Sequence, residues 1–233
     1  MLLLAIDTSG RHGSIALARA EEDAQASGEA EIRDIEILEV VPLSGGTFSA
    51  QLVPQVAVTL NKHGFSKNDI GGFAVASGPG SFTGLRVGLA AIKGLAEILG
   101  KPIAIVSTLE AVAHGSGCEG KVTAVLDAGR GEVYAGEYEI SLGNAQCISE
   151  QLLTTEEFMV RMRGAKVVAC DGVFAEAAKT AGMSFSIIEP INAGAIARIG
   201  WRKIRAGDTI SPEQLQANYI RRTDAEILAK IGS

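Results

Sequence analysis

The chain of 233 residues is 47% hydrophobic and 21% charged, which allows one large core or two small ones and excludes a disordered chain. Its formal net charge is −6 without a basic stripe, so a protein that binds nucleic acid unaided is not indicated. The three cysteines are widely spaced and form no CxxC pair, so no disulfides are expected. The opening run MLLLAI is short and no long apolar run follows, so we predict a cytoplasmic protein without membrane contact.

The first half of the chain predicts the order β-β-β-α-β-α-β. Apolar runs predict strands at 2–6, 14–18 and 35–41, and the acidic stretch 21–29 between the last two has no apolar period and is expected to form a loop. Helical spacing then runs from Ser49 to Gly64, and the run 72–76 predicts a buried strand. A loop at 77–84, a helix at 83–99 ended by Gly100, and a strand at 102–106 complete this half.

The second half repeats the same order. Strands are expected at 122–126, 133–138, 147–152, 167–170 and 185–188, with helices at 155–163 and 174–181. LLLAIDTSGRHGSIALA aligns with VTAVLDAGRGEVYAGEYE, so that Asp7 corresponds to Asp127. We therefore predict an α/β fold made of two ribonuclease H-like subdomains, the plan of the actin-like ATPase (ASKHA) superfamily, which by itself defines no function.

The domain prediction follows from the repeat. We expect an N-terminal subdomain at 1–107 and a C-terminal subdomain at 108–207. The amphipathic helix 193–205 is expected to close the second subdomain, and the tail at about 208–233 is expected to return to the first.

Both strand-end turns offer a possible nucleotide site. In the superfamily, an acidic residue and a Gly/Ser/Thr turn in each half hold phosphate and Mg²⁺, which here would be Asp7, Thr8 and Ser9 with Asp127 and Gly129. The alternative is that both are hairpin turns capped by aspartate, and we favour it over a working ATPase or phosphotransferase.

The loop SGPGSFTGLR lies between a strand and a helix N-terminus and is rich in glycine. Gly78 and Gly80 would suit a phosphate-binding turn, but no Walker lysine follows, and a tight strand-to-helix connection explains the loop equally well. In the next helix, Gly84 and Gly88 begin a face of small residues, which indicates close packing either on the sheet or on the helices of a partner. The two interpretations remain open here.

Metal and nucleophile chemistry is not indicated. His12, His63 and His114 stand alone, without HxxxH or HExxH spacing or a cysteine cluster, and no GxSxG elbow is present. No catalytic residue and no metal ligand is therefore expected.

Several motifs together resemble the bacterial TsaB (YeaZ) family: AIDTS, SGPGSFTGLRVGLAAIKGLA, VSTLEA, DAGRGEVYAGEY and NYIRR. The resemblance covers nearly the whole chain, and it departs from the family at Phe48-Ser49, where a histidine pair is common. It implies a non-catalytic subunit that pairs with the catalytic TsaD and acts with the ATPase TsaE in threonylcarbamoyl transfer to N6 of adenosine 37 of tRNA.

The resemblance also implies how the subunit binds its partners. The two helices of the first half would form a helical bundle with TsaD, or with a second copy when the subunit is alone, and tRNA would be reached only through the complex. No cofactor is expected, although a weakly or interface-bound nucleotide stays open. The expected interface residues are Leu52, Val53, Val56, Leu60, Gly84, Arg86, Gly88, Leu89 and Ile92.

Overall fold

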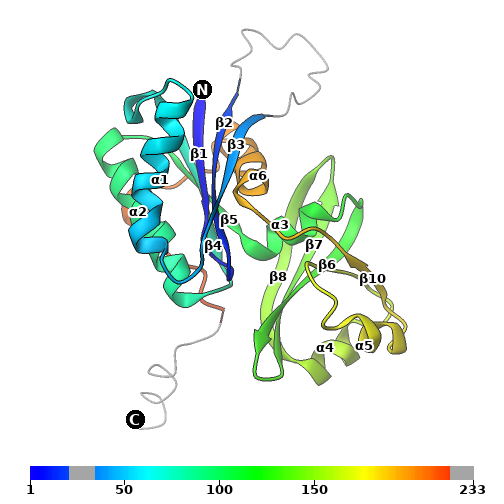
Figure 1. The fold of residues 1–233 in the computed structure, drawn as a ribbon. Coiled ribbons are helices and arrows are strands. Elements are labelled where there is room, and N and C mark those ends of the chain that lie inside the picture. Colours follow the sequence, from blue (N-terminus) through cyan, green and yellow to red (C-terminus); the bar gives the residue numbers. More distant parts are fainter. Residues whose placement is uncertain (21–34, 221–233) are drawn as a thin grey trace, which may run out of the picture. The chain divides into compact units, whose positions relative to one another are not determined.

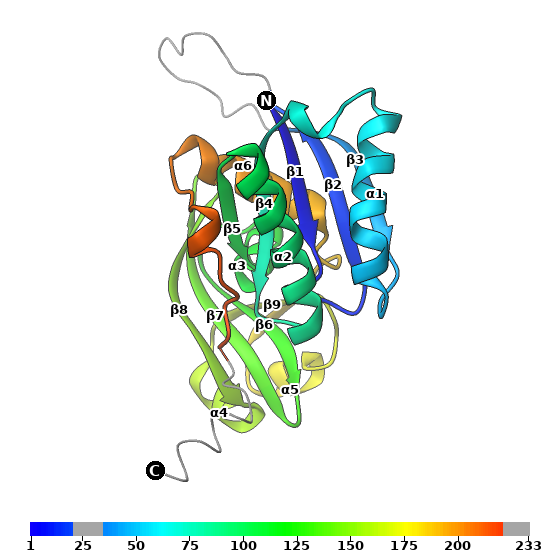
Figure 2. The same cartoon turned by 90° about the vertical axis from the view of Figure 1, so that its left-hand side faces the viewer.

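The computed structural model describes residues 1–20 and 35–220, so the predicted acidic loop and the end of the tail lie outside the described residues (Figures 1 and 2). The chain divides into two compact units. Within the described residues, the first contains Met1–Ala111 and Ile191–Ala217, and the second contains Val112–Pro190 and residues 218–220.

The first unit is a five-stranded mixed sheet covered on both faces. Its strands are β1 (Leu2–Asp7), β2 (Gly13–Arg19), β3 (Glu36–Leu43), β4 (Ile70–Gly78) and β5 (Ile103–Ser107), in the order β3-β2-β1-β4-β5. The three hairpin-linked strands are antiparallel, whereas β4 and β5 run parallel to β1 because helical crossovers connect them. A short 3₁₀ turn, Lys67–Asp69, precedes β4.

Helices cover the two faces of this sheet. The helices α1 (Phe48–Lys62) and α2 (Phe82–Leu99) lie on one face, and α6 (Ala193–Arg205) lies on the other (Figure 1). Because strand side chains alternate between faces, Leu4 and Ile6 pack under α1 and α2 while Leu3 and Ala5 pack under α6. Both faces of the central strands are therefore buried.

The second unit has the same strand order. Its strands are β6 (Gly120–Gly129), β7 (Glu132–Ser141), β8 (Asn144–Thr154), β9 (Lys166–Ala169) and β10 (Ser184–Ile187), in the order β10-β9-β6-β7-β8. The helices α4 (Thr155–Arg161) and α5 (Ala175–Thr180) cover one face through Phe158, Phe174 and Ala178. When each sheet is followed from the third strand of its unit to the fifth, the orders are β3-β2-β1-β4-β5 and β8-β7-β6-β9-β10. The two orders are equivalent, which confirms the duplicated ribonuclease H-like fold.

Two features differ from the sequence expectation. The helix α3 (Thr108–Gly115) was not predicted, and it crosses the boundary between the two units. The helix α6 was expected to close the second subdomain, at 108–207, but it packs on the first sheet, where Ile196, Ile199 and Trp201 are buried against β-strand alanines. The expectation was wrong because amphipathic spacing shows that a helix has a buried side but not which sheet buries it.

The tail after α6 continues along the first unit. Ile210 pairs with Ile103 of β5, and Leu215, after the 3₁₀ turn Pro212–Gln214, joins the core under α1 and α2. Residues 208–217 thus follow the expected return to the first unit, whereas residues 218–220 belong to the second and the rest of the tail lies outside the described residues.

Candidate functional site

The aspartate at the end of each first strand caps its own turn. In the first unit, Asp7 Oδ1 accepts hydrogen bonds from the Ser9 backbone N–H at 2.9 Å and from Ser9 Oγ at 2.7 Å. In the second unit, Asp127 Oδ1 accepts from the Gly129 N–H at 2.8 Å. Both arrangements are Asx turns, the capping interpretation that the sequence favoured.

The Asp7 carboxyl is buried, with 4% of its surface exposed. Burial raises the pKa of Asp7 above its ordinary value, and the two hydrogen bonds from Ser9 only partly oppose this effect. Asp127, by contrast, is exposed at the surface of its unit. The two carboxyls thus occupy equivalent positions in the fold but different electrostatic environments.

The protein's own backbone occupies the space beside Gly80 and Gly84, the glycines that follow β4. Ser81 N–H donates to the Ser9 carbonyl at 2.6 Å, and Thr8 Oγ1 donates to the Gly84 carbonyl at 2.7 Å. A Cβ at Gly80 or Gly84 would overlap the carbonyl oxygens of Ser9 and Thr8. The structure therefore brings the predicted residues Thr8, Ser9 and Gly80 together, and these residues pack directly against one another.

The two remaining predicted glycines, Gly78 and Gly129, both have a positive φ. Gly78 has φ +105° at the end of β4, a conformation that favours glycine, and precedes a cis proline. Ser81 caps α2 by accepting from the Gly84 N–H at 3.2 Å. Gly129 has φ +70° in the β6–β7 turn, beside Arg130 at φ +60°. These positions are explained by turn geometry.

Most of the residues expected at the partner interface are buried inside the first unit. Seven of its nine residues lie in the core between the helices and the sheet: Leu52, Val56, Leu60, Gly84, Gly88, Leu89 and Ile92. A Cβ at Gly88 would overlap Thr8 Oγ1, so the small face of α2 serves close packing inside the first unit. Of the predicted set, only Val53 and Arg86 are exposed. Apolar residues surround both helices, so periodicity alone did not distinguish the inner face from the outer one.

The outer faces of α1 and α2 form a groove of 570 Å³, which we call the α1–α2 groove. It is lined by Ser49, Leu52, Val53, Phe82, Thr83, Arg86, Val87, Ala90 and Ala91. Val53 is 59% exposed and Phe82 is 40% exposed, although both are large apolar side chains. The Arg86 guanidinium lies 3.6 Å from the centre of the Phe82 ring, a cation–π contact at the edge of the groove.

The exposed side of α1 is uncharged over most of its length. From Phe48 to Asn61 the helix contains no acidic or basic residue, and its exposed Ala50, Val53 and Ala57 fall within about 60° around the helix, whereas Val58 lies about 140° from Val53. Exposed helix faces of soluble proteins usually carry charged residues. A contiguous apolar surface of this kind is typical of a protein–protein contact. The missing charges in α1 were the sequence signal that could have identified its outer side as a contact surface.

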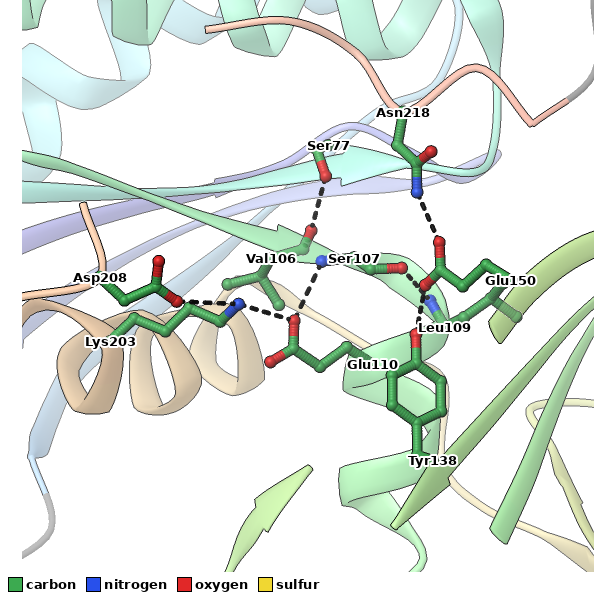
Figure 3. Close-up of polar contacts among 10 residues, drawn as sticks. All are labelled: Ser77, Val106, Ser107, Leu109, Glu110, Tyr138, Glu150, Lys203, Asp208 and Asn218. Carbon is green, nitrogen blue, oxygen red and sulfur yellow. Dashed lines mark hydrogen bonds and ion pairs between the residues drawn. The ribbon is translucent and has the colours of Figure 1, made fainter. Parts of the chain in front are cut away.

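Polar clusters elsewhere hold the fold together (Figure 3). In the first unit, Lys203 Nζ of α6 lies 3.1 Å from Glu110 Oε2 of α3 and 3.7 Å from Asp208 Oδ2. In the second unit, the buried Tyr138 hydroxyl donates to Glu150, whose other oxygen accepts from the Asn218 amide at 2.6 Å. Each cluster joins segments distant in sequence, which is a structural role.

The described residues contain no group of three or more His, Cys, Asp or Glu side chains arranged to hold a metal ion. Over the same ranges, no helix is long and apolar enough to cross a membrane.

Comparisons with known proteins extend these observations. Two sheets with the same strand order, each beginning with an aspartate-capped hairpin, define a duplicated ribonuclease H-like protein of the ASKHA type. The model of the family described as TsaD, tRNA N6-adenosine threonylcarbamoyltransferase, matches residues 40–197. Within this group, the chain belongs to the TsaB (YeaZ) family.

Individual relatives support this assignment. The chain is 34% identical over 161 residues to the tRNA threonylcarbamoyladenosine biosynthesis protein TsaB of Bacillus subtilis, covering 69% of this chain and 63% of that protein. It is 40% identical over 92 residues to TsaB of Escherichia coli, covering 38% of this chain and 40% of that protein. The matched region thus spans less than two thirds of these two curated relatives. The solved structure of YeaZ from Pseudomonas aeruginosa superimposes with a TM-score of 0.71 at 25% identity, covering 94% of this chain and 99% of that one.

Proposed function

We propose that this protein is a non-catalytic subunit in the biosynthesis of threonylcarbamoyladenosine in tRNA, the pathway in the names of its relatives. It would pair with a TsaD-type catalytic subunit, act with a TsaE-type ATPase, and form a homodimer through the same surface when alone. Transfer of the threonylcarbamoyl group would take place on the TsaD-type subunit.

The observation that carries this proposal is the α1–α2 groove. Its apolar lining and the uncharged outer side of α1 suit the burial of another protein's helices. Arg86 lies at the rim of the groove over the Phe82 ring, where its guanidinium would bind a carboxylate or carbonyl oxygen of the partner. Arginine and aromatic residues are common among the residues that dominate binding energy.

The alternative, an ATPase or phosphotransferase that uses Asp7 and Asp127, has less support. The Asp7 carboxyl is buried and occupied by Ser9, and the neighbouring glycines contact the Thr8 and Ser9 backbone. The burial that raises the pKa of Asp7 also disfavours the ionised carboxylate that a Mg²⁺ ligand requires.

The test compares two valines of the same helix. Val53 is 59% exposed in the groove, and Val58 is 56% exposed but does not line it. Burying an unpaired carboxylate at an interface centre should cost at least about 2 kcal/mol, or about thirtyfold in Kd. Val53→Asp should therefore weaken binding to the TsaD-type subunit of the same organism by about that factor, while Val58→Asp should bind nearly as well as the wild type.

Two readouts complete the experiment. Affinity is measured by calorimetry with the purified partner, and thermal melting confirms that both variants are folded. Loss of threonylcarbamoyladenosine formation in the reconstituted reaction should follow the loss of affinity. Equal binding by the two variants would contradict the assignment of the groove, and wild-type protein that does not bind the partner would contradict the proposed function.

A further inference from the structure

The buried Asp7 side chain has no role in the function proposed above. Its carboxyl lies at the carboxyl end of β1 with 4% of its surface exposed, and its Oδ1 atom accepts both hydrogen bonds that Ser9 donates. Burial of a carboxyl group is unfavourable unless its hydrogen bonds compensate. The bonds to Asp7 fix the conformation of the turn that follows β1.

This turn also holds the start of α2. The Ser9 carbonyl accepts from the Ser81 N–H at 2.6 Å, and Ser81 is the N-cap of α2. The Thr8 hydroxyl donates to the Gly84 carbonyl, in the first turn of the helix, at 2.7 Å. The first turn of α2 is therefore attached by two hydrogen bonds to the two residues that follow Asp7.

The same hairpin contacts the start of α1. A Cβ at Gly13 would lie 2.9 Å from Cε1 of Phe48, the first residue of α1, and 3.0 Å from the Asp7 carbonyl oxygen. In the segment before α1, a Cβ at Gly45 would overlap the Arg11 carbonyl oxygen. The end of β1 and the starts of α1 and α2 lie at the same end of the first sheet (Figure 2). Such close packing leaves little room for the hairpin and the two helix starts to move separately.

One end of the α1–α2 groove is made by these two helix starts. Ser49 of α1 and Phe82 and Thr83 of α2 line the groove there. Phe82 directly follows the N-cap Ser81, and its 40%-exposed ring carries the Arg86 guanidinium at 3.6 Å. A displacement of the N-cap would therefore move the aromatic and cationic side chains at the rim of the groove.

We propose that Asp7 is a positioning residue for partner binding, because its turn holds the first turns of α1 and α2 in the arrangement that forms the α1–α2 groove. The inference rests on the proposed function, which assigns this groove to the partner. The contacts lead from the Asp7 carboxyl through Ser9 to Ser81, and Phe82 follows in the chain. A surface that is ordered before binding loses less conformational entropy when the partner binds.

The test removes the acceptor on which the turn depends. Asp7→Ala leaves the Ser9 N–H and hydroxyl without their acceptor, so the Ser9 carbonyl is no longer held toward Ser81. If the groove-forming arrangement is then populated about one tenth of the time, calorimetry should show a rise of about tenfold in Kd for the TsaD-type subunit. Asp7→Asn retains an Oδ1 acceptor and should keep the wild-type Kd. Ser9→Ala removes one of the two bonds and covers the case in which Asp7→Ala does not fold, with an expected rise of about threefold.

The second unit provides a matched control. Asp127 caps the equivalent turn, where its Oδ1 atom accepts from the Gly129 N–H at 2.8 Å, in the unit that does not contain the groove. Asp127→Ala should therefore bind the partner with the wild-type Kd. Lys203→Met removes an ion pair of α6, on the other face of the first sheet. It should also keep the wild-type Kd at a temperature where it stays folded, because a loss of stability alone leaves the groove unchanged.

Hydrogen exchange measures the effect on the helix start without the partner. The amides of Ser81 and Leu85 donate to the carbonyls of Ser9 and Ser81, and NMR can follow both in the full-length chain. Both amides should exchange about tenfold faster in Asp7→Ala, and at the wild-type rate in Asp7→Asn. The amide of Ile196 in α6 should keep its wild-type rate in both variants.

The outcomes are distinct from those of the groove experiment. Wild-type Kd in Asp7→Ala, equal rises in Kd for Asp7→Ala and Asp127→Ala, or equally faster exchange at Ser81 and Ile196 would each overturn this inference. Any of these results leaves the groove assignment to be decided by Val53→Asp. If the wild type does not bind the TsaD-type subunit, the proposed function fails, and the exchange rates still decide whether Asp7 orders the start of α2.

Discussion

Replacing Gly88 by alanine tests whether the small face of α2 serves internal packing. A Cβ at Gly88 would overlap Thr8 Oγ1, whose hydroxyl donates to the buried Gly84 carbonyl at 2.7 Å. Overpacking costs about 1 to 3 kcal/mol, and a displaced buried hydrogen bond costs about 1 to 3 kcal/mol more. The higher helix propensity of alanine returns about 1 kcal/mol. The net loss should be about 3 kcal/mol.

Gly94 of the same helix provides the control. No heavy atom lies within 4 Å of a Cβ placed there, so Gly94→Ala should gain up to about 1 kcal/mol from helix propensity. The two alanine variants should therefore differ by about 4 kcal/mol in the free energy of unfolding.

The chain's single tryptophan makes the measurement local. Trp201 is buried in the first unit, so its fluorescence during urea unfolding follows that unit and not the second. A difference below about 1 kcal/mol between Gly88→Ala and Gly94→Ala would refute the packing argument. If the argument holds, adding Thr8→Ala to Gly88→Ala should recover the part of the loss that comes from overlap.

Two further predictions concern buried ionisable groups. Asp7→Asn keeps an acceptor for the Ser9 N–H. Because the pKa of Asp7 is raised in the folded state, the wild type loses stability as the pH rises from near 4 through that pKa. The stability of Asp7→Asn relative to the wild type should therefore increase over the same range. Melting at pH 4 and pH 8 checks this, and a gap that is the same at both would contradict it. Lys203→Met leaves the 8%-exposed Glu110 without its ion pair and should cost about 2 kcal/mol. In a double-mutant cycle, Glu110→Gln should recover part of that loss, and strictly additive effects would show that the pair is not coupled.

Much of the fold could be predicted because central strands such as β1 and β4 are apolar runs followed by a turn. The repeat of Asp7 at Asp127 correctly indicated two equivalent sheets. The helix α3 was missed because its eight residues offer little more than two turns of periodic pattern. The placement of α6 depends on contacts such as the hydrogen bond from Ala193 N–H to Ser14 Oγ, which joins residues 179 positions apart.

The candidate site was harder to predict because it also depends on contacts between residues that are distant in sequence. Gly84 and Gly88 looked like a docking face because nothing in the local sequence shows that Thr8 fills the space beside them. That contact spans 76 positions in the sequence. Of the expected interface residues, Val53 and Arg86 are exposed, and the exposed Phe82 beside them was not among those expected.

The first unit is discontinuous in sequence, since α6 comes after nearly all of the second unit. During synthesis, the sheet formed by the first 111 residues has no cover for Leu3, Ala16 and Ala74 until the ribosome has added about 80 more residues and then α6. At typical elongation rates this interval lasts several seconds. The second unit can therefore fold while the first still exposes one apolar face, and α6 completes a domain that began about 190 residues earlier.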